Sequence, residues 1–251
     1  MFVYSDLNFK GGTGKSTLAE NLSDALRRKG KRVLVIDGDR QRNSSTTLLR
    51  GQASPTLAEV FTGKATLQEA MIEAKPGLFV VPGSTDLNDT ATHIVQHRTA
   101  YYTVRDQLAE IRGLDFVIID HAGAYTPVME ALLLASDAML IPCKLEPYAV
   151  AGLFDMFEKL QKTLTDHTLA NAGIIPFAVD LRYEMTRAYM KELRDEFGEL
   201  VTAPIRTDAL GIKAQSLQMT IFEYEEEYKE HSRAGDDFRG LADDFIEESQ
   251  L

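Results

Sequence analysis

Short continuous runs of apolar residues recur along the chain, and longer stretches of mixed polarity separate them. Several of these runs lack the alternation of a half-buried strand, as expected for parallel strands that are covered on both faces. The pattern predicts strands at Phe2–Leu7, Arg32–Ile36, Leu78–Val81, Phe116–Ile119, Ala138–Pro142 and Ile174–Val179.

The stretches between these runs carry helical periodicity. Every fourth residue of Leu18–Leu26 is leucine, which predicts a helix that ends at Gly30. Ala151–Leu164 has a similar apolar stripe, and the polar segment Thr85–Arg112 is expected to form helices over one face of the sheet. Alternating strands and helices predict an α/β fold with a doubly wound, mostly parallel sheet and helices on both faces. Ligands of such folds bind at the carboxyl ends of the strands.

The composition is that of a globular protein. At 251 residues and 44% hydrophobic content, the chain can bury a sizeable core, and a single domain over residues 1–251 fits this length. The segment Met1–Phe9 is too short and too polar for a secretory signal, and no stretch approaches the ~18 apolar residues of a membrane span. We therefore expect a cytoplasmic protein. The single cysteine, Cys143, excludes an internal disulfide and any Cys-x-x-Cys metal site, and its neighbours predict a buried strand end.

The formal charge of the chain is −11, from 38 acidic and 27 basic residues. Because the whole protein repels polyanions, any contact with nucleic acid must be local. The acidic excess gathers in two late stretches, the glutamates of 223–227 and the acidic residues of 236–248. We expect these runs to form solvated helix faces.

The segment Asn8–Thr17 follows the first apolar run and leads directly into the first predicted helix. Its glycines allow backbone angles that other residues avoid, so several N–H groups can converge on phosphate oxygens beside the positive helix N-terminus. A strict Walker A motif needs glycine where Phe9 stands. The Gly-Lys-Ser-Thr sequence at a strand-to-helix junction nevertheless favours a triphosphate site over a simple glycine-rich turn. The predicted ATP contacts are Gly11, Gly12, Thr13, Gly14, Lys15, Ser16 and Thr17, with Lys15 neutralising phosphate charge and Ser16 binding Mg²⁺.

A second lysine, Lys10, precedes the glycines and distinguishes this segment from an ordinary phosphate loop. The sequence from Lys10 to Ser16 resembles the deviant Walker A motif, Lys-Gly-Gly-x-Gly-Lys-[Ser/Thr], of the ParA/MinD family of ATPases. The resemblance implies that Lys10 contacts the phosphates of a nucleotide bound by a partner subunit, and that ATP drives formation of a homodimer. A purely structural Lys10 is the alternative, although two ammonium groups beside one loop repel each other unless an anion lies between them.

The second predicted strand runs into a segment that extends the resemblance. Asp37–Asn43 is similar to the family's Asp-x-Asp-Pro-Gln-Gly-Asn motif, with Arg40 and Arg42 in place of proline and glycine. By resemblance, Asp39 orients the attacking water or accepts its proton, and Asp37 supports the metal. The alternative interpretation is that the two aspartates form a turn that precedes a helix cap.

The fourth predicted strand ends in Asp120, as in a Walker B motif, and Asp120 is expected to hold Mg²⁺ through a water ligand. The family continues with Asp-x-Pro-Pro, whereas this chain has His121, which we interpret as a loop residue without a catalytic task rather than as a proton-transfer group. Later segments resemble the family more weakly. The resemblance places Glu146 near the partner subunit's nucleotide. It also implies that adenine is contacted by a loop after the last strand, formed by Pro204, Ile205 and Arg206.

Members of the ParA/MinD family differ in the surface to which they attach. The acidic terminal segment Leu241–Leu251 would be repelled by anionic lipid, so we do not expect membrane binding. The segment Tyr183–Phe197 predicts a helix with three cations on one face, which could contact DNA phosphates in a dimer. Interleaved acidic residues make an ordinary salt-bridged surface an equal alternative. The candidate DNA-binding residues are Arg182, Arg187, Lys191 and Arg194.

The resemblance as a whole implies a small ParA-like ATPase for plasmid or chromosome partition, with slow MgATP hydrolysis and an ATP-dependent homodimer that binds DNA without sequence preference. Its expected partner is a ParB-like or small ribbon-helix-helix adaptor that stimulates hydrolysis, and its expected location is the nucleoid. Two alternatives remain open. One is a related ATPase that positions another cargo, such as a conjugation complex, a carboxysome or a chemoreceptor array. The other is a dethiobiotin-synthetase-like ligase, which predicts substrate-dependent ADP formation and no response to DNA.

Overall fold

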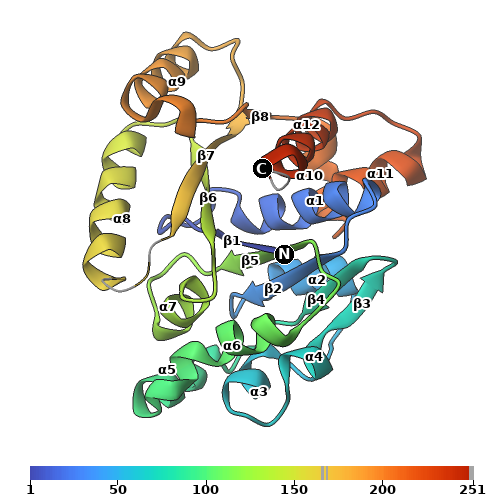
Figure 1. The fold of residues 1–251 in the computed structure, drawn as a ribbon. Helices are drawn as coiled ribbons and strands as arrows, with labels where there is room; N and C mark the ends of the chain where they lie inside the picture. Colours follow the sequence, from blue (N-terminus) through green and yellow to red (C-terminus); the bar gives the residue numbers. More distant parts are fainter. Residues whose placement is uncertain (165–166, 168, 249–251) are drawn as a thin grey trace.

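The computed structural model describes residues 1–164, 167 and 169–248 of the chain. Its strands are β1 (Phe2–Asp6), β2 (Val33–Gly38), β3 (Ile72–Lys75), β4 (Leu78–Val81), β5 (Phe116–His121), β6 (Ala138–Lys144), β7 (Ala170–Val179) and β8 (Ile205–Arg206). They form one eight-stranded sheet in the order β3-β4-β2-β5-β1-β6-β7-β8 (Figure 1). Neighbouring strands are parallel except β3 and β4, which pair antiparallel at one edge. The carboxyl ends of the parallel strands therefore meet along one edge of the sheet.

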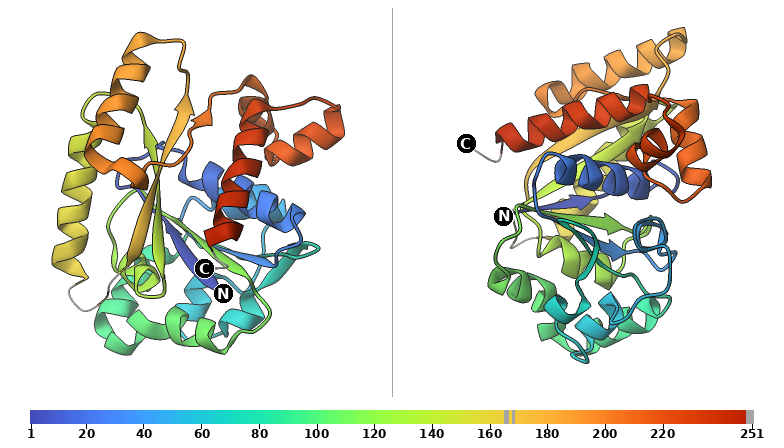
Figure 2. Two further views of the ribbon diagram at one scale, coloured as in Figure 1. Left: turned by 45° about the horizontal axis from the view of Figure 1, so that its top comes forward. Right: turned by 90° about the vertical axis from the view of Figure 1, so that its right-hand side faces the viewer.

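Helices cover both faces of this sheet (Figure 2). They are α1 (Lys15–Arg28), α2 (Asn43–Leu49), α3 (Leu57–Phe61), α4 (Leu67–Ala70), α5 (Leu87–Gln96), η1 (Arg98–Tyr102), α6 (Thr103–Glu110), α7 (Pro127–Leu133), α8 (Ala149–Thr163), α9 (Glu184–Phe197), η2 (Gly198–Leu200), α10 (Ala209–Ser216), α11 (Ile221–Tyr228) and α12 (Arg233–Glu248). The helices α1, α11 and α12 pack on one face, against Tyr4, Val35 and Ile118. The helices α3 to α9 cover the other face, where Leu34 and Ile119 lie among their apolar contacts. Of the helices in the described part of the chain, none is long and apolar enough to cross a bilayer.

The strands expected from the apolar runs are all present, with boundaries that differ by a few residues. Helix α1 stops just before Gly30, whose φ of 82° cannot continue a helix, and the predicted helices of Thr85–Arg112 are confirmed as α5, η1 and α6. The expectation that Ile205 and Arg206 lie in a loop is wrong, because they form β8 and pair with β7. Both β8 and the unpredicted β3 are short edge strands without an apolar run, so only their pairing defines them.

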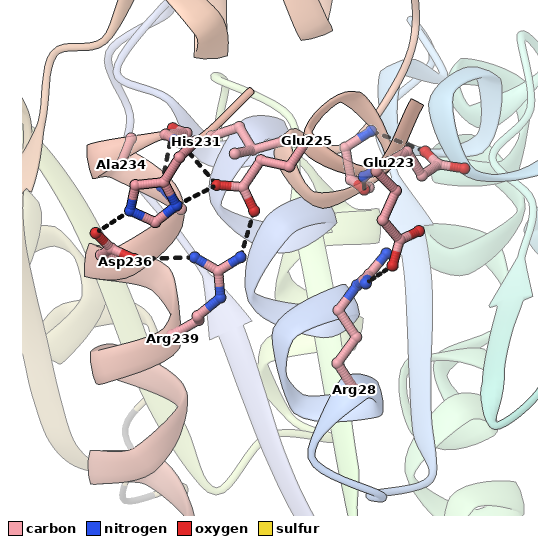
Figure 3. Close-up of polar contacts among 12 residues, drawn as sticks. Arg28, Glu223, Glu225, His231, Ala234, Asp236 and Arg239 are labelled. Atoms are coloured by element: carbon pink, nitrogen blue, oxygen red, sulfur yellow. Dashed lines mark hydrogen bonds and ion pairs between the residues drawn. The ribbon is translucent and has the colours of Figure 1, made fainter. Parts of the chain in front are cut away.

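Most acidic residues near the end of the chain are exposed, as expected, but several of them make polar contacts with other side chains (Figure 3). The Glu225 carboxylate is only 9% exposed and forms an ion pair with Arg239 of α12. Glu223 is also largely covered, and one of its oxygens lies 2.9 Å from the ammonium of Lys75. Asp243, by contrast, is 59% exposed as expected and pairs with Lys29, which directly follows α1. Part of the acidic excess therefore stabilises the contacts among α1, α11 and α12 rather than forming a free anionic face.

Candidate nucleotide site

The glycine loop connects β1 to α1 at the carboxyl edge of the sheet. Gly14, the last residue before the helix, has a φ of 105°. A β-carbon at this position would lie 2.4 Å from ring atoms of Phe177. Both the backbone angle and the close approach of Phe177 therefore require glycine here.

The side chain of Lys15 is buried beneath the loop. Its ammonium donates hydrogen bonds to the carbonyl oxygens of Asn8 at 3.0 Å and Lys10 at 3.3 Å. A β-carbon on Gly123 would lie 3.8 Å from the same ammonium, so the chain after β5 approaches the loop at this point. Lys15 is thus held where the glycine loop meets the chain after β5. An anion bound in the loop would be stabilised by its positive charge.

A cleft of about 950 Å³ opens in front of the loop. This volume lies at the upper end of small-molecule pockets, which hold about 300 to 1,000 Å³. The sequence-predicted residues that the structure brings to this cleft are Gly11, Gly12, Gly14, Lys15, Ser16, Thr17, Asp39, Ile205 and Arg206.

The far wall of the cleft contains Ile205 and Arg206, which the sequence predicted, and several residues that it did not predict. It includes Phe177 at the end of β7, Phe238 of α12, and Gly211 and Ile212 of α10. The two phenylalanine rings have centroids 6.5 Å apart. Such an apolar and aromatic surface suits the flat ring of a nucleotide base. No local motif marks these residues, because they meet only when the last helices fold back over α1.

Three buried carboxylates form a row across neighbouring strands. Asp6 of β1 is in register with Asp120 of β5, which in turn is in register with Asp37 of β2. Burial raises the pKa of Asp37 to about 6 and that of Asp120 to about 7, and the charge of Asp37 adds to the effect on Asp120. Burial also raises the pKa of Asp6 well above its ordinary value. A cation beside this row would stabilise the ionised carboxylates.

The polar contacts of this row fit the expected Mg²⁺ at Asp120 and Ser16. One carboxylate oxygen of Asp120 accepts a hydrogen bond from the Ser44 hydroxyl at 2.6 Å. The other is buried without a hydrogen-bond partner among the described residues, and the Ser16 hydroxyl lies beside the carboxylate. Within the described residues, no three His, Cys, Asp or Glu side chains could hold a metal alone. The unpartnered oxygen of Asp120 and the Ser16 hydroxyl beside it suit Mg²⁺, which takes one or two protein ligands together with phosphate and water.

The two aspartates after β2 have different surroundings. One oxygen of Asp37 accepts hydrogen bonds from the hydroxyl and the backbone N–H of Ser45, at 2.6 and 2.8 Å. Asp37 thus accepts hydrogen bonds from the first turn of α2. Asp39 is half-buried, lines the cleft, and accepts a hydrogen bond from the backbone N–H of Gln41 at 2.9 Å. Asp39 therefore has access to a ligand, whereas Asp37 shapes the loop behind it.

The interpretation of His121 as a loop residue is wrong. His121 is the last residue of β5 and is buried, and its Nε2 lies 2.7 Å from the Ser5 hydroxyl. The Ser136 hydroxyl donates to a backbone carbonyl, so it accepts from Ser5, and Ser5 in turn accepts the Nε2 proton of His121. Burial, with a smaller contribution from Lys15, lowers the pKa of His121 to about 3. The imidazole is therefore neutral and anchors the end of β5 to β1.

Lys10 does not share the large cleft with Lys15. It lines a separate cleft of about 390 Å³ beside α8 and forms an ion pair with Glu146. Thr13 also lines this second cleft, and its hydroxyl donates to the Lys10 carbonyl at 3.4 Å. Pro204, a predicted adenine contact, is not among the described residues that line either cleft. The two lysines of the motif thus point to different sides of the glycine loop.

The predicted basic stripe belongs to α9 and the residues before it. Arg182 forms an ion pair with Asp180, and Lys191 pairs with Asp195 on the same helix. The guanidinium of Arg187 instead donates to two backbone carbonyls, which carry no formal charge. Half of the stripe is therefore salt-bridged, and Arg187 and Arg194 are its stronger candidates for an external anion.

Comparison with known proteins agrees with this geometry. A family model described as an AAA domain matches residues 3–171. The chromosome partitioning protein ParA of Caulobacter vibrioides is 33% identical over 207 residues, which cover 79% of this chain and 78% of the relative. The chromosome-partitioning ATPase Soj of Thermus thermophilus is 32% identical over 197 residues, which cover 77% and 76%.

Solved structures confirm the fold. A Cyanothece McdA variant in complex with ATP has a TM-score of 0.82 at 21% identity, covering 97% of this chain and 95% of that chain. The septum site-determining protein MinD of Pyrococcus horikoshii, solved with Mg-ADP, has a TM-score of 0.77 at 23% identity, covering 97% and 95%. The fold, the deviant Walker A motif and the two partition relatives agree with one another. The chain therefore belongs to the AAA domain family and is a P-loop ATPase of the ParA/MinD type.

Proposed function

We propose that this chain is a ParA-like partition ATPase that acts as a nucleotide switch. It binds MgATP, forms a homodimer, holds DNA without sequence preference on the nucleoid, and is released when a ParB-like or small ribbon-helix-helix adaptor stimulates slow hydrolysis. The partition relatives at about one-third identity support this role.

The proposal rests mainly on one observation: Lys10 and Lys15 line different clefts. Lys15 lies in the large cleft with Ser16 and Asp39, where it would neutralise the phosphates of the protomer's own nucleotide. Lys10 lies on the outer side of the loop, with its side chain 62% exposed. An exposed ammonium beside a phosphate cradle, directed away from it, suits a phosphate supplied by a second protomer.

Residues that line the large cleft, together with the buried Asp120, would carry out hydrolysis. Asp39 would orient the attacking water and accept its proton. Ser16 and Asp120 would hold Mg²⁺, which when bound neutralises charge on the phosphates. Phe177 and Ile212 would enclose the base and exclude water from one side of the cleft.

DNA would contact the exposed cations of α9. Arg187 and Arg194 carry charge that no described carboxylate neutralises, whereas Arg182 and Lys191 are paired. A dimer doubles this surface, so weak single contacts would become a useful affinity. The acidic charge of the rest of the chain keeps the contact confined to this helix.

The test is DNA binding with and without a non-hydrolysable ATP analogue, at several salt concentrations. Wild type should bind DNA only with the analogue, and affinity should fall as salt rises. Replacing Arg187 and Arg194 by alanine should weaken binding at least tenfold. The control replaces Arg105 of α6 and Lys162 of α8, two exposed cations on other helices, and should leave binding unchanged. Equal binding by both double variants would reject the α9 surface. ADP formation that requires a small-molecule substrate and ignores DNA would favour the ligase.

A further inference from the structure

A third cleft, of about 280 Å³, lies behind the loop that carries Asp39. It is lined by residues at both ends of α2, by Pro82 and Gly83 after β4, and by Gln218 before α11. It shares Thr46 and Gln218 with the large cleft, so the two spaces are neighbours. Its volume is just below the range of typical small-molecule pockets, about 300 to 1,000 Å³. A ligand of this cleft would be smaller than a nucleotide.

The backbone around this cleft is unusual. Among the described residues, six non-glycine residues have a positive φ, and three of them line this cleft. They are Arg42 (56°), Arg50 (55°) and Gln218 (54°). Left-handed backbone is disfavoured for such residues and concentrates at functional sites. All three side chains are long hydrogen-bond donors, and the family motif resembled by this segment has glycine where Arg42 stands.

The charges of the cleft favour an anion. Nε of Arg42 is buried and has no hydrogen-bond partner among the described residues. Arg50 lies 2.9 Å from a Glu223 oxygen, but that carboxylate is shared with Lys75 at the same distance. Arg50 therefore shares its carboxylate with a second cation, and its side chain is 57% exposed. Among the described residues that line the cleft, none is acidic.

We propose that this cleft binds a phosphate-class oxyanion. The guanidinium groups of Arg42 and Arg50 would donate paired hydrogen bonds to its oxygens, and the amide of Gln218 would add another donor. Two sources share this chemistry: inorganic phosphate released in the neighbouring cleft, and the phosphoryl group of a small phosphomonoester. The proposal does not depend on the partition role, because it rests on residues outside the glycine loop.

The experiment is a calorimetric titration of the full chain with inorganic phosphate. Arg42→Gly should weaken phosphate binding at least tenfold, because a charged donor is lost from a covered position. This variant should fold, since glycine accepts a φ of 56° without strain. Arg40→Ala removes the same charge two residues away, outside the lining of the described clefts, and should bind like wild type. Arg42→Lys keeps the charge but not the planar fork, so it should recover only part of the affinity.

Phosphate can also enter the glycine loop, and Lys15→Ala separates the two sites. Binding that persists in Lys15→Ala and is lost in Arg42→Gly supports the proposal. Loss in Lys15→Ala with wild-type binding in Arg42→Gly overturns it and places the anion in the glycine loop. Failure of wild type to bind millimolar phosphate also overturns it. A parallel titration with glycerol 3-phosphate distinguishes the sources. Equal affinity for both probes indicates a phosphomonoester, and binding of inorganic phosphate alone indicates the hydrolysis product.

Discussion

Lys10 and Glu146 form an ion pair within one protomer, across the outer side of the glycine loop. The two side chains are 62% and 38% exposed. Exposed ion pairs of this kind contribute about 0.2 to 1 kcal/mol. The pair therefore orients Lys10 but binds it only weakly. A phosphate from a partner protomer could replace the carboxylate.

The first prediction concerns the dimer. Lys10→Ala should bind a non-hydrolysable ATP analogue but raise the dimer dissociation constant at least tenfold, because a charged contact between protomers is lost. Gel filtration with light scattering measures this constant. Lys162→Ala, on the exposed surface of α8, is the control and should dimerise like wild type. An unchanged dimer in Lys10→Ala would contradict the role of this lysine.

The partner of Lys10 predicts a smaller effect. Glu146→Gln removes the carboxylate while keeping the size of the side chain. Since the exposed pair contributes at most about 1 kcal/mol, the dimer dissociation constant should change by less than about fivefold. The same light-scattering measurement checks it. A change of a hundredfold would mean that Glu146 itself holds the partner or its nucleotide.

The next prediction concerns hydrolysis. Asp39→Ala should still form the dimer with ATP but lower turnover by about a hundredfold or more, because it removes the group that orients water and accepts its proton. Phosphate release and light scattering measured on the same sample separate the two effects. Wild-type turnover in this variant would remove Asp39 from the mechanism.

Stability should depend on pH through the buried carboxylates. The pKa of Asp120 is raised from its ordinary value of 3.8 to about 7, mainly by burial. The folded chain thus binds more protons than the unfolded chain between about pH 4 and pH 7, and the free energy of unfolding falls as pH rises through this window. Asp120→Asn removes this titration and should stabilise the nucleotide-free protein at pH 8 by on the order of 2 kcal/mol. Urea unfolding at pH 5 and pH 8 measures the effect.

The matched control for this pH effect is Asp106→Asn, which changes an exposed carboxylate of α6. It should leave the difference in unfolding free energy between pH 5 and pH 8 as in wild type. If Asp120→Asn shows the same pH dependence as this control, the row of carboxylates does not titrate as the structure implies.

Two glycines of the loop should respond differently to alanine. Gly14→Ala should lower the free energy of unfolding by about 2 to 3 kcal/mol, because its φ is 105° and a β-carbon would overlap the Phe177 ring. Gly11→Ala has open space around its β-carbon and should change stability by less than about 0.5 kcal/mol. Urea unfolding without nucleotide compares the two. Equal stability of both variants would show that Phe177 yields to the added methyl group.

The parts of the site that follow from the sequence are local. The glycine loop is made of consecutive residues, so its composition and its place between a strand and a helix indicate a phosphate cradle. Asp37 and Asp120 could be placed beside it because parallel strands bring their carboxyl ends to one edge. The interpretation of His121 as a loop residue failed because its partner, Ser5, is distant in the chain.

By itself, the sequence determined the fold class, the phosphate loop and the family. Each depends on a contiguous pattern of apolar residues or on a short motif. Tertiary structure alone decided the far wall of the cleft, the opposite directions of Lys10 and Lys15, and the basic cleft of Arg42 and Arg50. Each of these depends on contacts between residues that are distant in the chain. Such contacts form through packing and charge pairing in three dimensions, and the local periodicity of the sequence does not predict them.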